Sequence, residues 1–176
     1  MRIISGRYRG RALHPPHNLH ARPTTDFAKE SLFNILNNYF DFEKINVLDL
    51  FAGSGNISYE FASRNSPHID AIEKDTTNFS YIQQAIRDMK LETLFSYKTD
   101  VFRYLKTCHI NYDIIFADPP YDMDGIEKLP NLIFENNLLK PDGWFILEHS
   151  QRKSFENSKL FREERHYGNV HFSFFY

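Results

Sequence analysis

Short apolar runs recur along most of the chain, and each is bounded by polar or turn-forming residues. Runs of this length are typical of buried strands, and the segments between them are long enough to hold helices. Strands that alternate with helices favour a parallel sheet, so the pattern predicts an α/β protein. The predicted strands are Ile45–Leu50, His68–Glu73, Leu94–Lys98, Tyr112–Ala117 and Gly143–Glu148, and the predicted helices are Ile57–Arg64, Thr76–Met89, Val101–Leu105 and Ile126–Asn136.

The two ends of the chain follow other patterns. Large apolar residues recur near helical spacing over Asp26–Tyr39, which predicts a helix ahead of the first strand. Lys159–His166 and Asn169–Tyr176 look like strands joined by a tight turn near Gly168. No crossover helix fits between them, so we expect this pair to be antiparallel. A turn is also expected at Lys140-Pro141-Asp142-Gly143, before the fifth strand.

Size and composition narrow the class of protein. We expect a single domain over residues 1–176, with a basic N-terminal hairpin or arm over residues 1–22 and a core over residues 23–176. No apolar run approaches the roughly 18–20 residues of a membrane span, and the start lacks a secretory signal, so we expect a cytoplasmic protein without membrane association. Cys108 is the only cysteine and the eight histidines lack a paired spacing, so we expect no metal site.

Charge is distributed unevenly along the sequence. The formal net charge is −2, yet residues 1–30 hold six Lys or Arg side chains against two Asp or Glu. This segment therefore carries +4 and the remainder carries −6. A basic segment in an otherwise acidic chain is suited to contact phosphate groups. We expect such phosphate contacts from Arg7, Arg9, Arg11 and Arg22, and a solvated hairpin with positive side chains is the alternative.

The segment Val47–Gly55 carries the first sign of a cofactor site. Asp49 lies near the end of the predicted first strand, and Gly53 and Gly55 lie in the turn that follows. Glycines there let a ligand approach the backbone, although many α/β proteins have glycine at this point only to pack a helix on a strand. A dinucleotide fingerprint would need a third glycine at the position of Ser58. Asp49 would also repel a pyrophosphate but attract the positively charged methionine end of S-adenosylmethionine (SAM).

Two further acids follow the next two strands. Glu73 ends the second strand, where a carboxylate can accept both hydrogen bonds of a ribose diol. Asp100 follows the third strand, where it can accept a hydrogen bond from an adenine amino group, with Val101 or Phe102 beside the ring. A ribose acceptor serves NAD and SAM alike, but three acids at three successive strand ends favour SAM. The predicted cofactor residues are Asp49, Phe51, Ala52, Gly53, Ser54, Gly55, Glu73, Lys74, Asp100, Val101 and Asp118.

The fourth strand runs into Asp118-Pro119-Pro120-Tyr121, the predicted catalytic segment. Two prolines fix φ and remove two backbone donors, which leaves a rigid loop of acceptors. The Asp118 carboxylate and the Pro119 carbonyl could accept the two hydrogens of a nucleobase amino group. The nitrogen lone pair would then point at the sulfonium methyl group, so that an in-line displacement is driven mainly by positioning. Tyr121 would give an extruded or single-stranded base a flat face to stack on. A stiff surface turn is the alternative reading of the tetrapeptide taken alone.

Further segments carry a family signature, namely Ile4-Ser5-Gly6, Arg9-Gly10-Arg11, Arg22-Pro23-Thr24, Glu30–Leu36 and Leu147–Ser150. With them, the chain resembles the RsmD-like bacterial 16S ribosomal RNA guanine-N2 methyltransferases, which are class I SAM-dependent enzymes with a Rossmann-like fold. The resemblance spans nearly the whole chain. It implies a seven-stranded, mostly parallel sheet with an antiparallel last strand, and an N-terminal β-hairpin that helps to dock RNA.

The same resemblance implies SAM as the methyl donor and guanine N2 of 16S rRNA as the acceptor. It places the substrate RNA in an assembling small ribosomal subunit and the protein as a monomer. Asp118 through Tyr121 would hold the target guanine, and Arg22-Pro23-Thr24 would lie over the cofactor or target cleft. The chain departs from the family at Asn56-Ile57-Ser58 and Asn65, where small residues and glycine are usual, and at Phe27, where arginine is common.

Other functions share parts of this pattern. The same tetrapeptide serves adenine N6 and cytosine N4 in DNA or RNA, although the absence of a separate target-recognition domain favours a folded rRNA that supplies its own shape. A nicotinamide-dependent oxidoreductase could use the same fold, because fold does not fix function. A non-catalytic RNA-binding protein that retains the fold is the third alternative.

Overall fold

The computed structural model describes residues 1–15, 25–120 and 122–176. Its strands are β1 (Asn46–Leu50), β2 (His68–Glu73), β3 (Leu94–Lys98), β4 (Tyr112–Ala117), β5 (Leu139–His149), β6 (Phe161–Tyr167) and β7 (Val170–Phe175). They form one seven-stranded sheet in the order β3-β2-β1-β4-β5-β7-β6. Strands β1 to β5 are parallel, and β7 runs antiparallel to both of its neighbours, β5 and β6. The expected Rossmann-like sheet with an antiparallel last strand is therefore confirmed.

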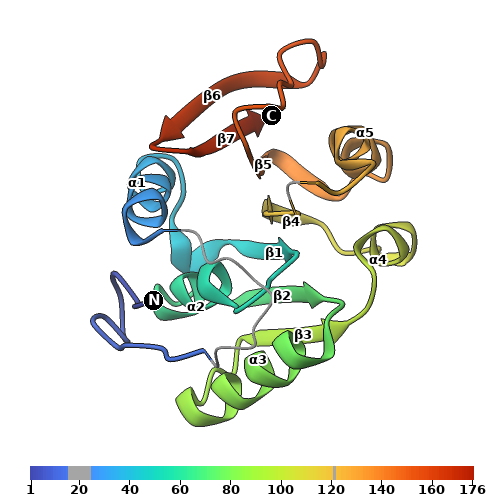
Figure 1. Cartoon of the computed structure of the whole chain (residues 1–176). Helices are drawn as coiled ribbons and strands as arrows, with labels where there is room; N and C mark the ends of the chain where they lie inside the picture. Colours follow the sequence, from blue (N-terminus) through green and yellow to red (C-terminus); the bar gives the residue numbers. More distant parts are fainter. Residues whose placement is uncertain (16–24, 121) are drawn as a thin grey trace.

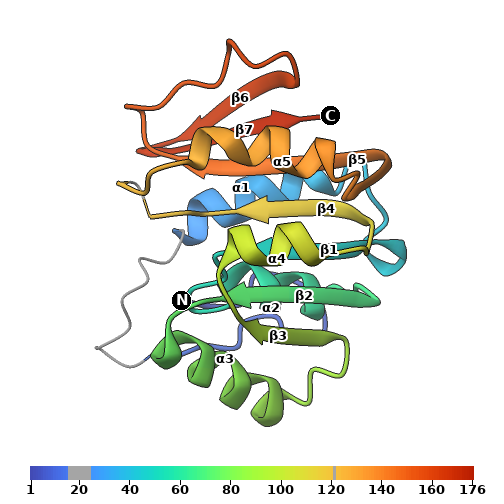
Figure 2. The ribbon, with the colours of Figure 1, turned by 90° about the vertical axis from the view of Figure 1, so that its right-hand side faces the viewer.

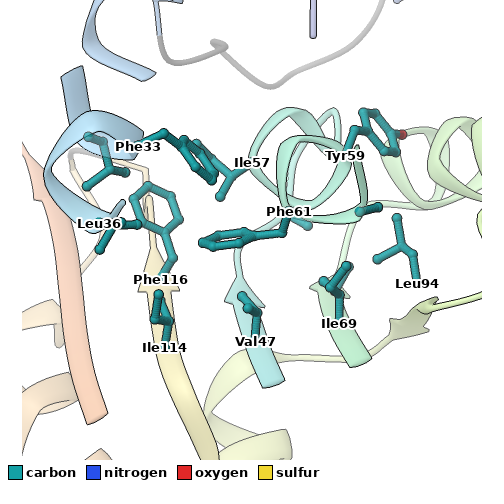
Figure 3. Packing of buried hydrophobic residues seen from close by; sticks show 14 of the residues in the cluster. Phe33, Leu36, Val47, Ile57, Tyr59, Phe61, Ile69, Leu94, Ile114 and Phe116 are labelled. Atoms are coloured by element: carbon teal, nitrogen blue, oxygen red, sulfur yellow. The ribbon is translucent and has the colours of Figure 1, made fainter. Parts of the chain in front are cut away.

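Helices cover both faces of the sheet, as Figures 1 and 2 show. They are α1 (Asp26–Leu36), α2 (Asn56–Ser63), α3 (Thr76–Met89), α4 (Val101–Thr107) and α5 (Leu129–Glu135), with short 3-10 turns η1 (Phe42–Lys44) and η2 (Ile126–Lys128). The helices α1, α2 and α3 pack on one face, and α4 and α5 pack on the other. The hydrophobic core on the face of α1, α2 and α3 is shown in Figure 3. There Phe33 and Leu36 of α1 and Phe61 of α2 turn toward the sheet, where they meet Val47 and Phe116.

The largest boundary error concerns the start of β5. The predicted turn at residues 140–143 lies inside this strand, because Tyr112 of β4 pairs with Leu139 and Ile114 already pairs with Trp144. The extra residues form a bulge, which accommodates Pro141 without a backbone donor and Asp142 at a φ of 62°. A Cβ on Gly143 would lie 2.9 Å from the Lys140 carbonyl oxygen, so the bulge also requires glycine.

Two predicted helices are shorter than expected. The first ends at Leu36 and not at Tyr39, because Asn38 and Tyr39 donate to carbonyls three residues back and the chain tightens into a turn at two poor helix formers, Asn37 and Asn38. The segment predicted as Ile126–Asn136 divides into η2 and α5, since Pro130 lacks the N–H that would continue the helical hydrogen bonds. The ranges of β2, β3, β4 and α3 are confirmed as predicted, and the other bounds differ by one or two residues.

Residues 1–15 form the described part of the N-terminal arm, and they fold back as a hairpin on α2. Arg2 and Ala12 form an antiparallel bridge, and Ile3 N–H donates to the Arg11 carbonyl at 3.0 Å. Gly6 has a φ of +80°, and a Cβ there would lie only 1.8 Å from the Ser63 carbonyl oxygen. The arm is therefore held against α2 by close backbone contact. Within the described ranges, no helix is long and apolar enough to cross a membrane.

Candidate active site

The predicted acids gather at one edge of the sheet. Because β1 to β5 are parallel, their carboxyl ends meet at a single edge, which we call the carboxyl edge. Asp49 is the penultimate residue of β1, Glu73 is the last residue of β2, Asp100 lies two residues past β3, and Asp118 directly follows β4. The topology therefore brings together four residues that are far apart in the sequence.

Asp49 is almost fully buried and turns toward α2. Ser58 of that helix donates a hydrogen bond to its Oδ2 at 2.5 Å. Burial, with a smaller contribution from the nearby Glu73, raises the pKa of Asp49 to about 7 despite the hydrogen bonds from Ser58. Ser58 stands where a dinucleotide fingerprint would have glycine, and here it orients the acid at the end of β1. A cationic ligand group beside Asp49 would favour its charged form.

The glycine-containing loop after β1 has positive φ angles, which allow a ligand to come close to its backbone. Phe51 has a φ of 62°, which is strained for a residue with a Cβ, and Gly53 and Gly55 have φ values of 56° and 80°. A Cβ on Gly55 would lie 2.4 Å from the ring of Tyr59, so only glycine fits there. Gly53 itself is partly exposed, and its N–H donates a hydrogen bond to Glu73 at the end of β2.

Glu73 joins the glycine loop to the end of β2. Its Oε2 accepts the Gly53 N–H at 2.7 Å, and its Oε1 accepts the Asp75 N–H at 2.7 Å. Each carboxylate oxygen has a second lone pair, so these bonds leave acceptor capacity for a ligand hydroxyl. The predicted ribose contact stays a prediction, and the structure adds a role in fixing the loop.

Asp100 also has a structural role that its sequence position did not reveal. It is the N-cap of α4, where Oδ1 accepts the N–H groups of Phe102 at 3.0 Å and Arg103 at 3.3 Å. Its Oδ2 lies 3.4 Å from Nζ of Lys74, another predicted cofactor residue, which is exposed. Val101 is buried behind this cap. A contact of Asp100 with adenine stays a prediction.

The predicted catalytic loop begins where β4 ends. Asp118 is half-buried, Pro119 is buried and Pro120 is exposed, while Tyr121 lies outside the described residues. The Pro120 carbonyl accepts the Met123 N–H at 2.9 Å, which closes a turn after the two prolines. Asp118-Pro119-Pro120 therefore leads directly from the sheet to the carboxyl edge, where the Pro120 carbonyl is tied to Met123.

A fifth strand-end acid, Glu148, was not among the predicted site residues. It is the second-last residue of β5 and is 3% exposed. Leu147 of β5 pairs with Ala117 of β4, so Glu148 lies beside the start of the Asp118 loop. The signal was present in the sequence, because Glu148 follows an apolar strand as the other acids do.

The arm carries its arginines at some distance from this edge. Arg7, Arg9 and Arg11 are exposed, and Arg22 lies outside the described residues. Arg7 N–H bonds to the Ser63 carbonyl, and Ser63 is the last residue of α2, whose first residue lies next to the glycine loop. The tip of the arm is therefore about one short helix, roughly 10 Å, from the carboxyl edge.

Sequence reasoning also missed a buried ion pair beneath the arm. Lys29 of α1 and Glu60 of α2 are both fully buried, with Nζ 3.6 Å from Oε2. Lys29 Nζ donates to the Arg2 carbonyl at 2.6 Å, and the Glu60 carboxylate accepts the N–H groups of Ile4 and Ser5. Burial lowers the pKa of Lys29, which Glu60 opposes. This pair joins α1, α2 and the arm.

Comparison with known proteins places the chain in a family. The model described as "Conserved hypothetical protein 95" matches residues 1–176. "Ribosomal RNA small subunit methyltransferase D" of Haemophilus influenzae is 31% identical over 172 residues, which cover 93% of this chain and 88% of that protein. The chain belongs to the RsmD-like methyltransferase family. The Escherichia coli K12 protein of the same name is 30% identical over 84% of this chain and 74% of its own length.

Solved structures support the fold of this RsmD-like methyltransferase. The structure of Escherichia coli yhhF, titled as a methyltransferase, superposes with a TM-score of 0.86 at 28% identity, over 99% of this chain and 96% of that one. A Thermus thermophilus structure gives a TM-score of 0.85 at 26% identity, over 99% and 98% of the two chains. The expectation of a Rossmann-like methyltransferase is thus confirmed at the level of family and fold.

Proposed function

We propose that this protein methylates the exocyclic N2 amino group of a guanine in 16S rRNA, with SAM as the methyl donor. The observation that carries the proposal is the position of Asp118-Pro119-Pro120 at the carboxyl end of β4, on the same edge as Asp49, Glu73 and Asp100. Relatives that cover most of the chain are named as small-subunit rRNA methyltransferases, which supports rRNA as the substrate.

The residues at the carboxyl edge fit SAM in chemistry. The partly exposed Gly53 lies in a loop with positive φ values that admits a ligand close to the backbone, and Asp49 offers a carboxylate to an ammonium group. Glu73 would hold the ribose, and Asp100 with Val101 would hold the adenine. Phe51, Ala52, Ser54, Gly55 and Lys74 complete the proposed binding surface, and Asp118 borders it. SAM supplies an electrophilic methyl group when bound.

Asp118 and Pro119 would make the acceptor reactive. A nucleobase amino group is a poor nucleophile, because its lone pair is delocalised into the ring. The Asp118 carboxylate and the Pro119 carbonyl would accept its two N–H groups, and the rigid turn after them fixes the direction of the lone pair. The nitrogen gains a methyl group and loses one proton, for which Asp118 and water are the available acceptors. Tyr121 is proposed as the stacking partner of the base.

The arm would bind the RNA backbone outside the catalytic loop. Arg7, Arg9 and Arg11 are exposed on a hairpin that is fixed to α2, so their charges have a defined place relative to the carboxyl edge. Arg22 is included in this proposal from its sequence position alone. A folded RNA in an assembling small subunit would extend from the arm to the Asp118 loop, with the protein acting as a monomer.

Adenine N6 or cytosine N4 of DNA or RNA is the alternative acceptor. A Parabacteroides distasonis protein named "tRNA1(Val) (adenine(37)-N6)-methyltransferase" is 28% identical over 127 residues, or 61% of this chain. Several relatives that span more of the chain carry small-subunit rRNA names, which favours guanine in 16S rRNA as the first candidate.

Substitution of Asp118 tests the proposed chemistry. Asp118→Ala should lower methyl transfer to unmethylated small-subunit particles by at least about 100-fold, because an aligned acceptor is lost. SAM affinity, measured by calorimetry, should change little. Lys106→Ala, at an exposed cation in the last turn of α4, serves as a control and should leave transfer unchanged. Loss of SAM binding in Asp118→Ala would instead assign this residue to the cofactor, and unchanged transfer would refute the clamp.

A further inference from the structure

An aromatic pair lies exposed at the carboxyl edge, away from the Asp118 loop. Phe27, in the first turn of α1, is 66% exposed, although its side chain is large and apolar. Its ring meets that of Tyr167, the last residue of β6, edge to face with centroids 6.0 Å apart and an interplanar angle of 79°. Tyr167 is itself packed against the core on the α1 face of the sheet. The pair is therefore a fixed feature with one ring largely open to solvent.

The pair shares the edge of the sheet with the catalytic loop. In Figure 2, α1 begins and β6 ends at the side where β4 and β5 also end. Ala117, the residue before Asp118, pairs with Leu147 of β5. The next residue of β5, Glu148, pairs with Phe172 of β7, which in turn pairs with Arg165 of β6. Three strand spacings separate β4 from β6, or roughly 14 Å. A chain of a few nucleotides from a base at Asp118 would reach Phe27.

Charged groups flank the two rings. Arg2 of the arm lies 3.2 Å from Asp26, the residue before Phe27, and its side chain is 62% exposed. Arg165 precedes Tyr167 by two residues and therefore faces the same side of β6, where its guanidinium group pairs with Glu163 at 2.6 Å. Aromatic faces with nearby cations are the means by which proteins hold unpaired bases and their phosphates. This composition suits RNA better than it suits an apolar protein surface.

We propose that Phe27 is a stacking platform for an unpaired base of the substrate RNA that neighbours the target nucleotide. Tyr167 acts as a positioning residue, because its ring holds the Phe27 ring from the side and leaves a face for the base. Arg2 and Arg165 contact the adjoining phosphates. The inference rests on the proposed action on RNA and adds a second base contact, separate from the clamp at Asp118.

The test compares Phe27→Ala, Phe27→Trp and Tyr39→Ala. Tyr39 is a matched control, since it is 67% exposed and follows the other end of α1, next to the start of β5. With unmethylated small-subunit particles as the substrate and protein-free 16S rRNA as a second binding probe, Phe27→Ala should raise the KM for the particles and the Kd for both at least about fivefold, the lower end of one lost stacking contact. The kcat at saturation and the salt dependence of binding should not change, because no charge is removed. Phe27→Trp should restore affinity, and Tyr39→Ala should leave it unaltered.

Several results would overturn the platform. One is that Phe27→Ala leaves the Kd and KM unchanged although the wild-type protein methylates the RNA. In that case the platform fails and the proposed function stands. Another is a loss of affinity for small-subunit particles but not for protein-free rRNA, because Phe27 would then contact a ribosomal protein. If the wild-type protein methylates no RNA, the proposed function fails together with the platform.

Discussion

At the scale of single residues, burial sets the behaviour of the acids at the carboxyl edge. Asp49 is enclosed by β1 and α2, and this burial raises its pKa to about 7 despite the hydrogen bonds from Ser58. Glu73 is also buried but accepts two backbone N–H groups. Residues with the same side-chain chemistry at neighbouring strand ends therefore have different tasks. One is poised to change its charge, and the other holds the glycine loop.

The raised pKa of Asp49 predicts how stability depends on pH. Its folded-state pKa lies above the unfolded value, so its favourable contribution is complete below about pH 4 and is lost as pH rises through about 7. Asp49→Asn should therefore increase the free energy of unfolding at pH 8 relative to wild type, by up to about 4 kcal/mol for a shift of this size. At pH 4 the two proteins should differ much less. Urea denaturation without SAM at both pH values measures this.

The sign of that difference is the decisive result. If Asp49→Asn were equally or less stable than wild type at pH 8, the folded protein would hold Asp49 in its ionised form without cost, and its pKa would not be raised. Its place in the site would then need another explanation. Asp88→Asn on the exposed part of α3 provides a control without a buried carboxyl group and should show no such pH dependence.

At the scale of elements, the arm depends on α1 and α2 for its position. The Glu60 carboxylate accepts the N–H groups of Ile4 and Ser5 and lies 3.6 Å from Lys29 Nζ. The arm is thus joined to the helix that follows the glycine loop. Met1 Sδ also lies 3.3 Å from Ser54 Oγ in that loop. The arm therefore contacts both the glycine loop and the helix that follows it.

Glu60→Ala should destabilise the protein by about 3–5 kcal/mol, because Lys29 would remain buried without its charge partner. The backbone N–H groups of Ile4 and Ser5 should then exchange with solvent faster in hydrogen-exchange experiments. The exposed pair of Lys44 and Asp41 is a suitable control, and Lys44→Ala should leave both measurements near their wild-type values. Unchanged exchange at Ile4 and Ser5 in Glu60→Ala would show that the arm is held by other contacts.

Local sequence predicted those elements whose limits are set by local chemistry. β4 is an apolar run bounded by Asn111 and Asp118, and its range was predicted correctly. The start of β5 was wrong, because the bulge at Asp142 depends on pairing with Tyr112, which lies 30 residues earlier. The strand-end acids could be found by counting along the chain. Their partners from other elements could not, since Ser58 and Gly53 meet Asp49 and Glu73 only after the sheet has formed.

At the scale of the whole molecule, one sheet edge collects the acids, the Asp118 loop and the pair of Phe27 and Tyr167. The basic arm lies along α2 and carries exposed arginines away from that edge. A protein with a net charge of −2 can therefore present positive charge where an RNA backbone would run, while acidic groups surround the proposed cofactor. This division of charge follows from the fold more than from overall composition.

The central claim is that this edge methylates guanine N2 in 16S rRNA. The most direct test incubates the protein and SAM with unmethylated small-subunit particles, digests the RNA, and identifies the methylated nucleoside by mass spectrometry. We expect N2-methylguanosine from the wild-type protein and none from the same reaction with Asp118→Ala. The appearance of N6-methyladenosine or N4-methylcytidine, or of no methylated nucleoside with the wild-type protein, would contradict it.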